Sequence, residues 1–312
     1  MKVVDLKRFG AADNFSFIDI DVPSPSEHQV LIKVFAFSIN PIDYLVRSGQ
    51  AMKELYSELK PRIIGWDIAG VVESVGKAVK NFKEGDEVFG MINFPGVGKA
   101  YGEYVVAHQE HIALKPSNIN FVDAAASTLA ALTAYKALEI LKVKKDDRVL
   151  IHGAAGGVGH FAVQIAKSRK AYVIGTASAS NHSFVKDMGA DEVLDYHVPQ
   201  YLNVLKNVDK VLESIGGENI EKSLNTMNSD GLIVCLHSRP QDRIEARAKA
   251  RRISGQSMVV NSDDKDILSI AKLLADGVIH PYVSKTYTID EIIDAHINIE
   301  SGKTIGKIVV TV

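Results

Sequence analysis

Cysteine is nearly absent from this sequence. Cys235 is the single cysteine among 312 residues, so the chain can form neither an internal disulfide nor a cysteine-based metal cluster. This usage is typical of a reducing compartment, and the first residues, MKVVDLKRFG, have no continuous apolar core of the kind found in secretory signals. We therefore expect a cytoplasmic protein.

The sequence also has no excess of one charge and no long hydrophobic run. Thirty-six Lys and Arg face 38 Asp and Glu, which gives a formal net charge of -2. Such a balance attracts neither a nucleic-acid backbone nor an anionic membrane. The small and apolar residues 124–137 form too short and too polar a run to span a bilayer. We interpret the basic segment 239–252 as a solvated loop and helix, and we expect neither a nucleic-acid nor a membrane partner.

The pattern of hydrophobic residues changes along the chain. Up to Asn120 short β-branched or aromatic runs alternate with glycine-containing turns, which predicts a β-rich domain. Asp123 is the expected cap of a helix over residues 123–141, and strands and helices then alternate, which favours a doubly wound parallel sheet. A helix over 290–301 and a last strand over 307–312 follow. Because that strand needs a partner sheet, we predict an α/β protein with a β domain of residues 1–122 and 281–312 and an inserted domain of residues 123–280.

The most informative motif is a glycine turn in VLIHGAAGGVGHFAVQIAK. Gly153, Gly156 and Gly159 follow an apolar strand and open an amphipathic helix, which is the context that a dinucleotide-binding turn requires. Glycine lets the backbone approach a pyrophosphate, and the helix N-terminus offers free N–H groups to it. The predicted function of this turn, including Gly157 and Val158, is to bind a nicotinamide dinucleotide.

The choice between NADPH and NADH is made near the end of the second strand. NAD-specific sites place an acid there, which binds the ribose hydroxyls. Residues 175–183 contain no acid, while Thr176, Ser178 and Ser180 stand at the strand end and in the turn after it. These hydroxyls are also typical of helix caps and turns. The segment favours NADPH.

The whole chain resembles the medium-chain dehydrogenase/reductase superfamily, and more narrowly its zinc-independent quinone oxidoreductase (zeta-crystallin-like) branch. The motifs that carry the resemblance are SINPIDYLVRSG, IIGWDIAGVVESVG, FKEGDEVFG, YGEYVVA, LTAYKAL, the glycine turn and GKIVV. The resemblance implies a GroES-like catalytic domain joined to a Rossmann domain, and a homodimer paired through edge strands of the Rossmann sheets. The candidate edges are residues 231–236 and 257–260.

The resemblance also assigns roles to individual residues. Asn40 and Asp43 fall in the N-P-x-D segment that lines the cleft near the nicotinamide, and Tyr44 is the candidate proton donor. Asn40 could equally serve only to shape a turn, and Tyr196 could be an ordinary surface tyrosine. The further positions that the resemblance assigns to cofactor binding are Thr133, Tyr196, Ile215, Leu236 and Lys307.

The resemblance also locates what is missing. Where zinc-dependent relatives have metal ligands this chain has Ser38 and Trp66, and His108 and His111 are interpreted as structural or surface residues. We therefore expect no metal. Without a metal Lewis acid, the acceptor itself must stabilise the added charge, as a quinone or a conjugated enone does.

The predicted function is hydride transfer from NADPH to a quinone. The alternatives are an enone or alkenal double-bond reductase and, from another class, an NADPH-binding redox sensor or an RNA-binding protein with little turnover, the last because zeta-crystallin-like proteins can bind AU-rich RNA.

Overall fold

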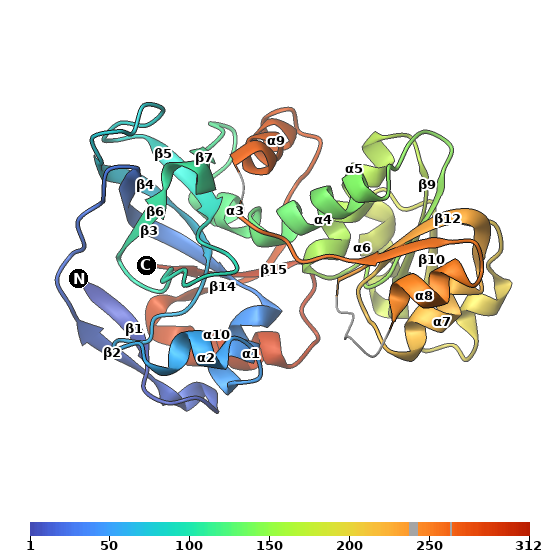
Figure 1. Ribbon diagram of the computed structural model, residues 1–312, viewed down its shortest axis with the longest axis horizontal. Helices are drawn as coiled ribbons and strands as arrows, with labels where there is room; N and C mark the ends of the chain where they lie inside the picture. Colours follow the sequence, from blue (N-terminus) through green and yellow to red (C-terminus); the bar gives the residue numbers. More distant parts are fainter. Residues whose placement is uncertain (237–242, 263) are drawn as a thin grey trace. The chain divides into compact units, whose positions relative to one another are not determined.

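A computed structural model describes residues 1–236, 243–262 and 264–312 of the chain (Figure 1). It divides into two compact units, residues 1–132 with 260–312 and residues 133–259. Residues 239–242, the start of the basic segment 239–252, lie outside the described residues. The part of the chain that the structure describes has no helix long and apolar enough to cross a membrane.

The first unit, called the β unit below, is built mainly from one largely antiparallel sheet. Its seven strands follow the order β14-β15-β3-β4-β5-β7, with β6 paired to β3, and β1 and β2 form a separate pair. Its strands are β1 (Lys2–Leu6), β2 (Phe15–Asp19), β3 (Gln29–Ile39), β4 (Asp67–Val75), β5 (Glu87–Met91), β6 (Tyr104–His108), β7 (Ile112–Leu114), β14 (Val283–Thr288) and β15 (Lys307–Thr311). Its helices are α1 (Pro41–Ser48), α2 (Lys53–Ser57), α3 (Phe121–Ala126), α9 (Asp264–Ala275) and α10 (Ile292–Glu300), with 3-10 turns η1 (Ala12–Asn14), η2 (Gln109–His111) and η6 (Ile289–Glu291).

The C-terminal strand returns to the N-terminal sheet, as the sequence predicted. β15 pairs antiparallel with β3, where Val310 lies opposite Phe37, and it pairs parallel with β14. The apolar side chains of β15 are buried, so the strand completes the core of the β unit.

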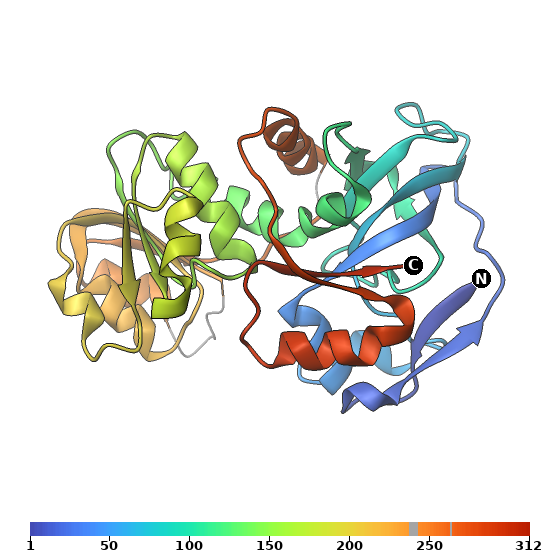
Figure 2. The same cartoon turned by 180° about the vertical axis from the view of Figure 1, so that it is seen from behind.

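The second unit, called the Rossmann unit below, is a six-stranded parallel sheet in the order β10-β9-β8-β11-β12-β13. In Figure 1 its helices α7 and α8 lie in front of the sheet, and in Figure 2 its helices α5 and α6 lie in front. The sheet is therefore covered on both faces, as a doubly wound sheet requires. The elements of the unit are β8 (Arg148–Ile151), α5 (Gly157–Ser168), β9 (Tyr172–Ala177), η3 (Ala179–Asn181), α6 (His182–Asp187), β10 (Glu192–Asp195), η4 (Tyr201–Val204), β11 (Val208–Glu213), α7 (Glu218–Leu224), β12 (Met227–Cys235), α8 (Ile244–Lys249) and β13 (Ser254–Ser257).

The boundaries between the two units lie at other residues than the domain boundaries predicted from the sequence. The expected boundaries followed residues 122 and 280, whereas the compact units change at 132/133, within α4 (Leu129–Ile140), and at 259/260. Hydrogen bonds give the reason. Ser262 Oγ accepts from the Phe94 N–H at 2.9 Å, and Asn118 Nδ2 donates to the Leu274 carbonyl at 3.0 Å, so the segment containing α9 is tied to the β unit.

The single helix predicted over residues 123–141 is wrong. The structure has α3 and α4 instead, and the cap of α3 is Asn120, whose Oδ1 accepts from the Asp123 N–H at 2.8 Å. Between the helices Ser127 Oγ donates to the Asp123 carbonyl, and Thr128 Oγ1 donates to the Ala125 carbonyl. Such hydroxyl-to-backbone bonds compete with helical ones and are favoured at helix ends, which the alanine-rich composition concealed.

Candidate functional site

The carboxyl ends of β8 and β11 meet in the middle of the Rossmann sheet. These strands are neighbours, and the chain order runs outward from them in opposite directions, through β9 and β10 on one side and through β12 and β13 on the other. In open α/β sheets this reversal is where ligands bind, just beyond the carboxyl ends of the strands. The glycine turn follows β8 directly, so the predicted site occupies this position.

The glycines of the turn serve different geometric needs. Gly153 has φ +61°, a left-handed conformation that favours glycine. Gly156 is the N-cap of α5, the position next to the free N–H groups of the helix. A Cβ on Gly159 would lie 2.1 Å from the Gly153 carbonyl oxygen, so the third glycine lets α5 pack against the turn. Gly157 and Val158 form the first turn of α5, where backbone N–H groups favour an anion.

The ends of β9 and β10 lie side by side next to this turn. Ser178 Oγ and Ser180 Oγ are 3.0 Å apart, and Ser180 is exposed. Asp195, at the end of β10, lies opposite Ala177 in the parallel register. Its carboxylate accepts from the His197 N–H and lies 3.0 Å from His197 Nδ1, and the backbone bond is the main cause that lowers the pKa of Asp195. Sequence reasoning missed this acid because it stands one strand away from the segment that normally decides the cofactor.

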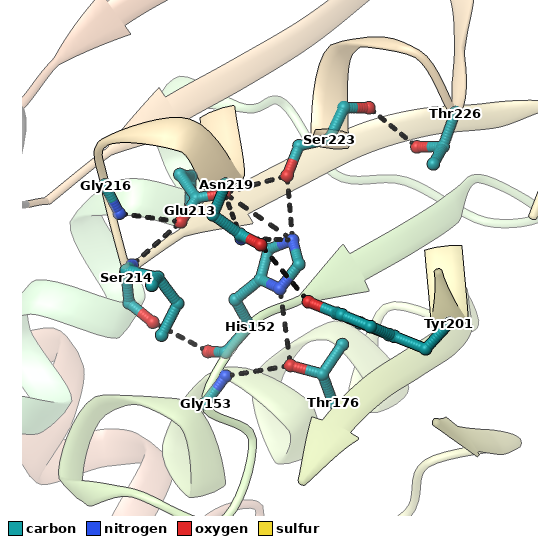
Figure 3. Close-up of polar contacts among 11 residues, drawn as sticks. His152, Gly153, Thr176, Tyr201, Glu213, Ser214, Gly216, Asn219, Ser223 and Thr226 are labelled. Carbon is teal, nitrogen blue, oxygen red and sulfur yellow. Dashed lines mark hydrogen bonds and ion pairs between the residues drawn. The ribbon is translucent and has the colours of Figure 1, made fainter. Parts of the chain in front are cut away.

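A buried polar network lies directly beneath the turn (Figure 3). His152, between β8 and Gly153, places Nε2 2.9 Å from Ser223 Oγ and Nδ1 3.3 Å from Thr176 Oγ1. Ser223 Oγ donates to Glu213 Oε2 at 2.8 Å, and His152 Nε2 lies 3.5 Å from the same oxygen. His152, Glu213 and Ser223 are at most 1% exposed. Burial lowers the pKa of His152, and the Glu213 carboxylate opposes that effect.

Glu213 also holds the loop that follows β11. Its Oε1 accepts from the Ile215 N–H at 2.8 Å and from the Gly216 N–H at 3.1 Å, while its Oε2 accepts from Asn219 Nδ2 at 2.9 Å. The Ile215 side chain is 59% exposed beyond this clamp. Sequence reasoning assigned Ile215 to the cofactor but gave no role to the side chains of His152 and Glu213. The available signal was a polar residue at the end of each apolar strand, in VLIHG and in VLES.

A second buried polar cluster lies in the β unit around Asp67. Asp67 Oδ2 accepts from Ser38 Oγ at 2.6 Å and from Asn40 Nδ2 at 2.7 Å, and Asp67 Oδ1 accepts from the Leu129 N–H at 3.0 Å. Lys307 Nζ donates to Asn40 Oδ1 at 2.5 Å and lies 3.8 Å from Asp67 Oδ2. Both polar ends of the Asn40 side chain are therefore held, so its orientation is fixed by Asp67 and Lys307.

Asp43 lies beside this cluster with 0% of its surface exposed. Its Oδ2 accepts from the Asn40 N–H at 2.6 Å, which caps the start of α1, and among the described residues Oδ1 has no hydrogen-bond partner. Burial, above all, raises the pKa of Asp43 to about 8. Asp43 is thus a neutral acid at neutral pH that fixes the backbone of Asn40.

We predict that Asp43→Asn flattens part of the pH dependence of stability. The pKa of the Asp43 carboxyl is 3.8 in the unfolded chain and about 8 in the folded protein. Its contribution to stability is therefore complete below pH 3.8, and it is lost as the pH rises through about 8, because the unfolded chain ionises first. The variant should gain stability relative to the native protein between these values, by at most about 1.4 kcal/mol per pH unit. Denaturant unfolding followed by the fluorescence of Trp66, the single tryptophan, measures the β unit. If the free energies of unfolding of the two proteins differ by the same amount at every pH, then Asp43 is not a neutral acid in the folded protein.

The remaining predicted residues are placed as follows. Tyr44 is half-buried in α1, next to Asp43. Thr133 is a buried residue of α4, and the Leu236 N–H donates to the Glu213 carbonyl at 2.9 Å. Thr176 is buried, with its hydroxyl toward His152 and Gly153, and Tyr196 is 49% exposed after β10. Lys307 is buried within the β unit, where its ammonium group also donates to the Ile39 carbonyl.

The histidine pair belongs to the β unit. The Asn93 N–H donates to His111 Nδ1 at 3.2 Å, and burial is the main cause that lowers the pKa of His111. Within the described ranges, no group of three or more His, Cys, Asp or Glu side chains is placed to hold a metal ion.

A GroES-like sheet unit combined with a doubly wound parallel sheet and a glycine turn at the strand-order reversal defines the class of two-domain dehydrogenases and reductases. Known protein families match both parts of the chain. Residues 26–117 match the alcohol dehydrogenase GroES-like domain, and residues 188–310 match a domain described as zinc-binding dehydrogenase.

Individual relatives are similar over nearly the whole chain. A quinone oxidoreductase of Homo sapiens is 32% identical over 99% of this chain and 97% of its own length. A 2-methylene-furan-3-one reductase of Solanum lycopersicum is also 32% identical, over 99% of this chain and 79% of its own length.

Solved structures agree with these matches. The quinone oxidoreductase of Coxiella burnetii is 34% identical with a TM-score of 0.94, covering 100% of this chain and 99% of that one. The Escherichia coli quinone oxidoreductase complexed with NADPH is 26% identical with a TM-score of 0.88, and the match covers all of both chains. The chain therefore belongs to the quinone oxidoreductase branch of the medium-chain dehydrogenase/reductase superfamily, and it is an oxidoreductase.

Proposed function

We propose that this protein transfers hydride from NADPH to a quinone. The observation that carries the proposal is the position of the glycine turn. It lies where the strand order reverses, and it places the N-terminus of α5 just beyond the carboxyl ends of the strands. The Escherichia coli neighbour, which is complexed with NADPH, supports the same cofactor here.

The preference for NADPH over NADH is supported by the polar residues after β9. No acid follows β9 before α6, and the Ser178 and Ser180 hydroxyls are close enough together to act on one phosphate group. Tyr196, exposed at the end of β10, is the proposed third contact with the 2′-phosphate. The full set of proposed cofactor-binding residues is Thr133, Gly153, Gly156, Gly157, Val158, Gly159, Thr176, Ser178, Ser180, Tyr196, Ile215, Leu236 and Lys307.

The protein's own residues would bind the cofactor and the acceptor and direct the proton. NADPH, when bound, supplies the hydride. Hydride addition to a quinone or an enone places negative charge on an oxygen, and donors fixed in advance stabilise that charge. Asn40 is proposed as such a donor and Tyr44 as the source of the proton, while Asp43, with no exposed surface, would act by positioning Asn40. The chemistry needs no metal, because the acceptor delocalises the charge.

A conjugated enone is the second candidate acceptor. It is favoured by the similarity to the tomato reductase, which matches this chain as closely as the human quinone oxidoreductase does. Loss of NADPH absorbance with a panel of quinones, 2-alkenals and cyclic enones compares the two functions. Faster turnover of an enone than of every quinone would assign the second function, and tight NADPH binding with no acceptor reduced would point to a sensor.

We propose that the protein forms homodimers through the β13 edge of the Rossmann sheet. Of the two edges suggested by sequence, the one near residues 231–236 is wrong, because β12 is flanked by β11 and β13. The second, near residues 257–260, is displaced, because the strand at that edge of the sheet is β13 at Ser254–Ser257, and the opposite edge is β10. A free edge is a template for pairing with another chain. Light scattering should give twice the chain mass of 34.0 kDa, and a monomer at micromolar concentration would contradict this proposal.

We also propose that the protein works in the cytoplasm and without nucleic acid. Its one cysteine, Cys235, is buried, which fits a reducing compartment but requires none. In the described part of the basic segment, Arg247 and Arg251 both pair with Glu221, so their charge is partly neutralised. Cell fractionation and a salt-dependent RNA titration test these two points, and sub-micromolar RNA binding would overturn the second.

A further inference from the structure

The polar network beneath the glycine turn forms a continuous path. It starts at the Gly153 N–H, which donates to Thr176 Oγ1 at 3.2 Å, and it ends at the Ile215 and Gly216 N–H groups on Glu213. Between these ends lie the His152 ring and the Ser223 hydroxyl (Figure 3). The path therefore joins the turn after β8 to residues 214–217, the loop after β11. The chemistry of its members decides the direction of each hydrogen bond.

On the Glu213 side the direction follows from donor and acceptor counts. The two oxygens of Glu213 face four donors, namely the Ile215 and Gly216 N–H groups, Asn219 Nδ2 and Ser223 Oγ, which is what an ionised carboxylate accepts. Ser223 has one hydroxyl hydrogen and gives it to this carboxylate. We therefore assign the ring hydrogen of His152 to Nε2, which donates to Ser223 Oγ 2.9 Å away. Asn219 Nδ2 lies 3.4 Å from the same nitrogen and, in this assignment, donates only to Glu213 Oε2, at 2.9 Å.

This assignment of the ring hydrogen also sets the direction of the hydrogen bonds on the Thr176 side. Burial keeps the imidazole neutral, so with a hydrogen on Nε2 the Nδ1 atom carries a lone pair. Thr176 Oγ1 donates to that lone pair at 3.3 Å and accepts from the Gly153 N–H. All hydrogen bonds along the path then point the same way, from Gly153 to the carboxylate. Each member polarises the next one in a buried setting, where removal of one link also weakens its neighbours.

A second contact between the same two segments runs along the backbone. Ser214 Oγ donates to the His152 carbonyl at 2.8 Å, so the loop is held to residue 152 at its first residue as well as through Glu213. Ser214 also lies close to Gly153, because a Cβ added to Gly153 would be 3.2 Å from Ser214 Oγ. The turn and the loop are thus connected at two points, both of which pass through His152.

We propose that His152 is a positioning residue that couples the glycine turn to the loop of residues 214–217, so that ordering of one segment stabilises the other. Where a dinucleotide is concerned the inference rests on the proposed function: a ligand whose phosphates bind at the turn would order the loop as well. The coupling itself belongs to the protein without ligand. Thr176 need not touch the loop, because the imidazole ring of His152 connects the Thr176 hydroxyl to the Ser223 hydroxyl and so to Glu213.

Thr176→Val tests the coupling, because it keeps the side-chain shape and removes the hydroxyl between Gly153 and His152. Amide hydrogen exchange of Ile215 and Gly216 in the cofactor-free protein should accelerate by roughly threefold to thirtyfold, the range expected for coupled members of one network. Ser223→Ala, which breaks the path on the other side of the ring, should accelerate exchange at Gly153 in the same way. Reciprocal effects are required if the two segments are coupled.

The matched control is Thr226→Val. Thr226 is also buried in the Rossmann unit, and its hydroxyl donates to the Ser223 backbone carbonyl, not to the path. In the Thr226→Val variant, the rates of amide hydrogen exchange at Ile215 and Gly216 should stay within about twofold of the rates in the native protein. That change is well below the change expected when a member of the network is replaced. Unchanged exchange at these amides in Thr176→Val, or equal acceleration in both variants, would overturn the proposal. Selective ¹⁵N labelling of histidine should show the His152 hydrogen on Nε2, and a hydrogen on Nδ1 would overturn the directed path.

NADPH separates this inference from the proposed function. Saturating NADPH should slow exchange at Ile215 and Gly216 in the native protein, and it should do so less in Thr176→Val. If NADPH binds to neither the native protein nor Thr176→Val, the proposal that NADPH is the cofactor is wrong. Hydrogen exchange measured without NADPH still tests whether the two segments are coupled. If NADPH protects the loop equally in both proteins, the path does not transmit binding, and the extension of the coupling to the cofactor is overturned.

Discussion

Gly159→Ala should weaken NADPH binding by on the order of a hundredfold and destabilise the Rossmann unit. The added Cβ would lie 2.1 Å from the Gly153 carbonyl oxygen and 2.7 Å from Ala154 Cα, both backbone atoms that cannot rotate away. α5 must therefore move off the turn. Overpacking of this kind typically costs about 1–3 kcal/mol. The displaced helix N-terminus would also lose N–H bonds to phosphate, each worth about 1.5–3 kcal/mol for a charged partner.

Gly156→Ala is the matched comparison for this prediction. Gly156 has an ordinary negative φ of -81°, and a Cβ there would meet the Gly153 carbonyl oxygen at 3.2 Å, a contact that a small shift relieves. The melting temperature should change little, while NADPH affinity falls, because this glycine lets the cofactor approach the backbone. Thermal melts and NADPH titration of both variants are the measurements. A Gly159→Ala protein with native affinity and melting temperature would refute the assigned packing role.

Ser178→Asp should reverse the cofactor preference. The new carboxylate would stand after β9, beside the Ser180 hydroxyl and near Asp195 on the neighbouring strand. A like charge facing the 2′-phosphate costs several kcal/mol, so kcat/KM for NADPH should fall by about a hundredfold or more. NADH has no phosphate there, and an acid at this point binds its ribose hydroxyls, so kcat/KM for NADH should stay the same or rise.

Ser178→Asn separates charge from size. It is nearly isosteric with the aspartate and uncharged, so it should lower kcat/KM for NADPH by much less. Steady-state kinetics with both cofactors and one acceptor are sufficient. If Ser178→Asp discriminates against NADPH no more than Ser178→Asn does, then the 2′-phosphate lies elsewhere, and Asp195 with its partner His197 becomes the next place to look.

Local sequence signals were sufficient wherever a short stretch of chain decides the outcome. The glycine spacing correctly predicted a helix directly after the turn, which is α5 (Gly157–Ser168), because strand, turn and helix are consecutive. They failed where side chains compete for the backbone, as at Ser127 and Thr128, whose hydroxyl bonds end α3 inside an alanine-rich run. They also placed the edge strand three residues late, because β13 has the polar sequence SGQS and is defined by pairing with β12.

Local sequence signals predict even less of the buried polar networks. His152 and Ser223 are 71 residues apart, and Asn40 and Lys307 are 267 residues apart, so no local pattern indicates that they touch. Sequence reasoning selected Lys307 as a cofactor neighbour but could not indicate that its ammonium group is bound to Asn40 and Ile39. Asp43 is a further case, since only complete burial makes its carboxyl group a neutral acid.

The sequence by itself determined the strand-turn-helix unit around Gly153, the acid-free stretch after β9 and the family, because each depends on residue type and spacing along the chain. Tertiary structure alone decided the order of the strands, the position of Asp195 beside that stretch, and the path from Gly153 through His152 to Gly216. The physical reason is that charge state and hydrogen-bond direction depend on burial and on partners brought together by folding. The glycine turn identifies the kind of ligand, and the contacts beneath it determine how the turn is held.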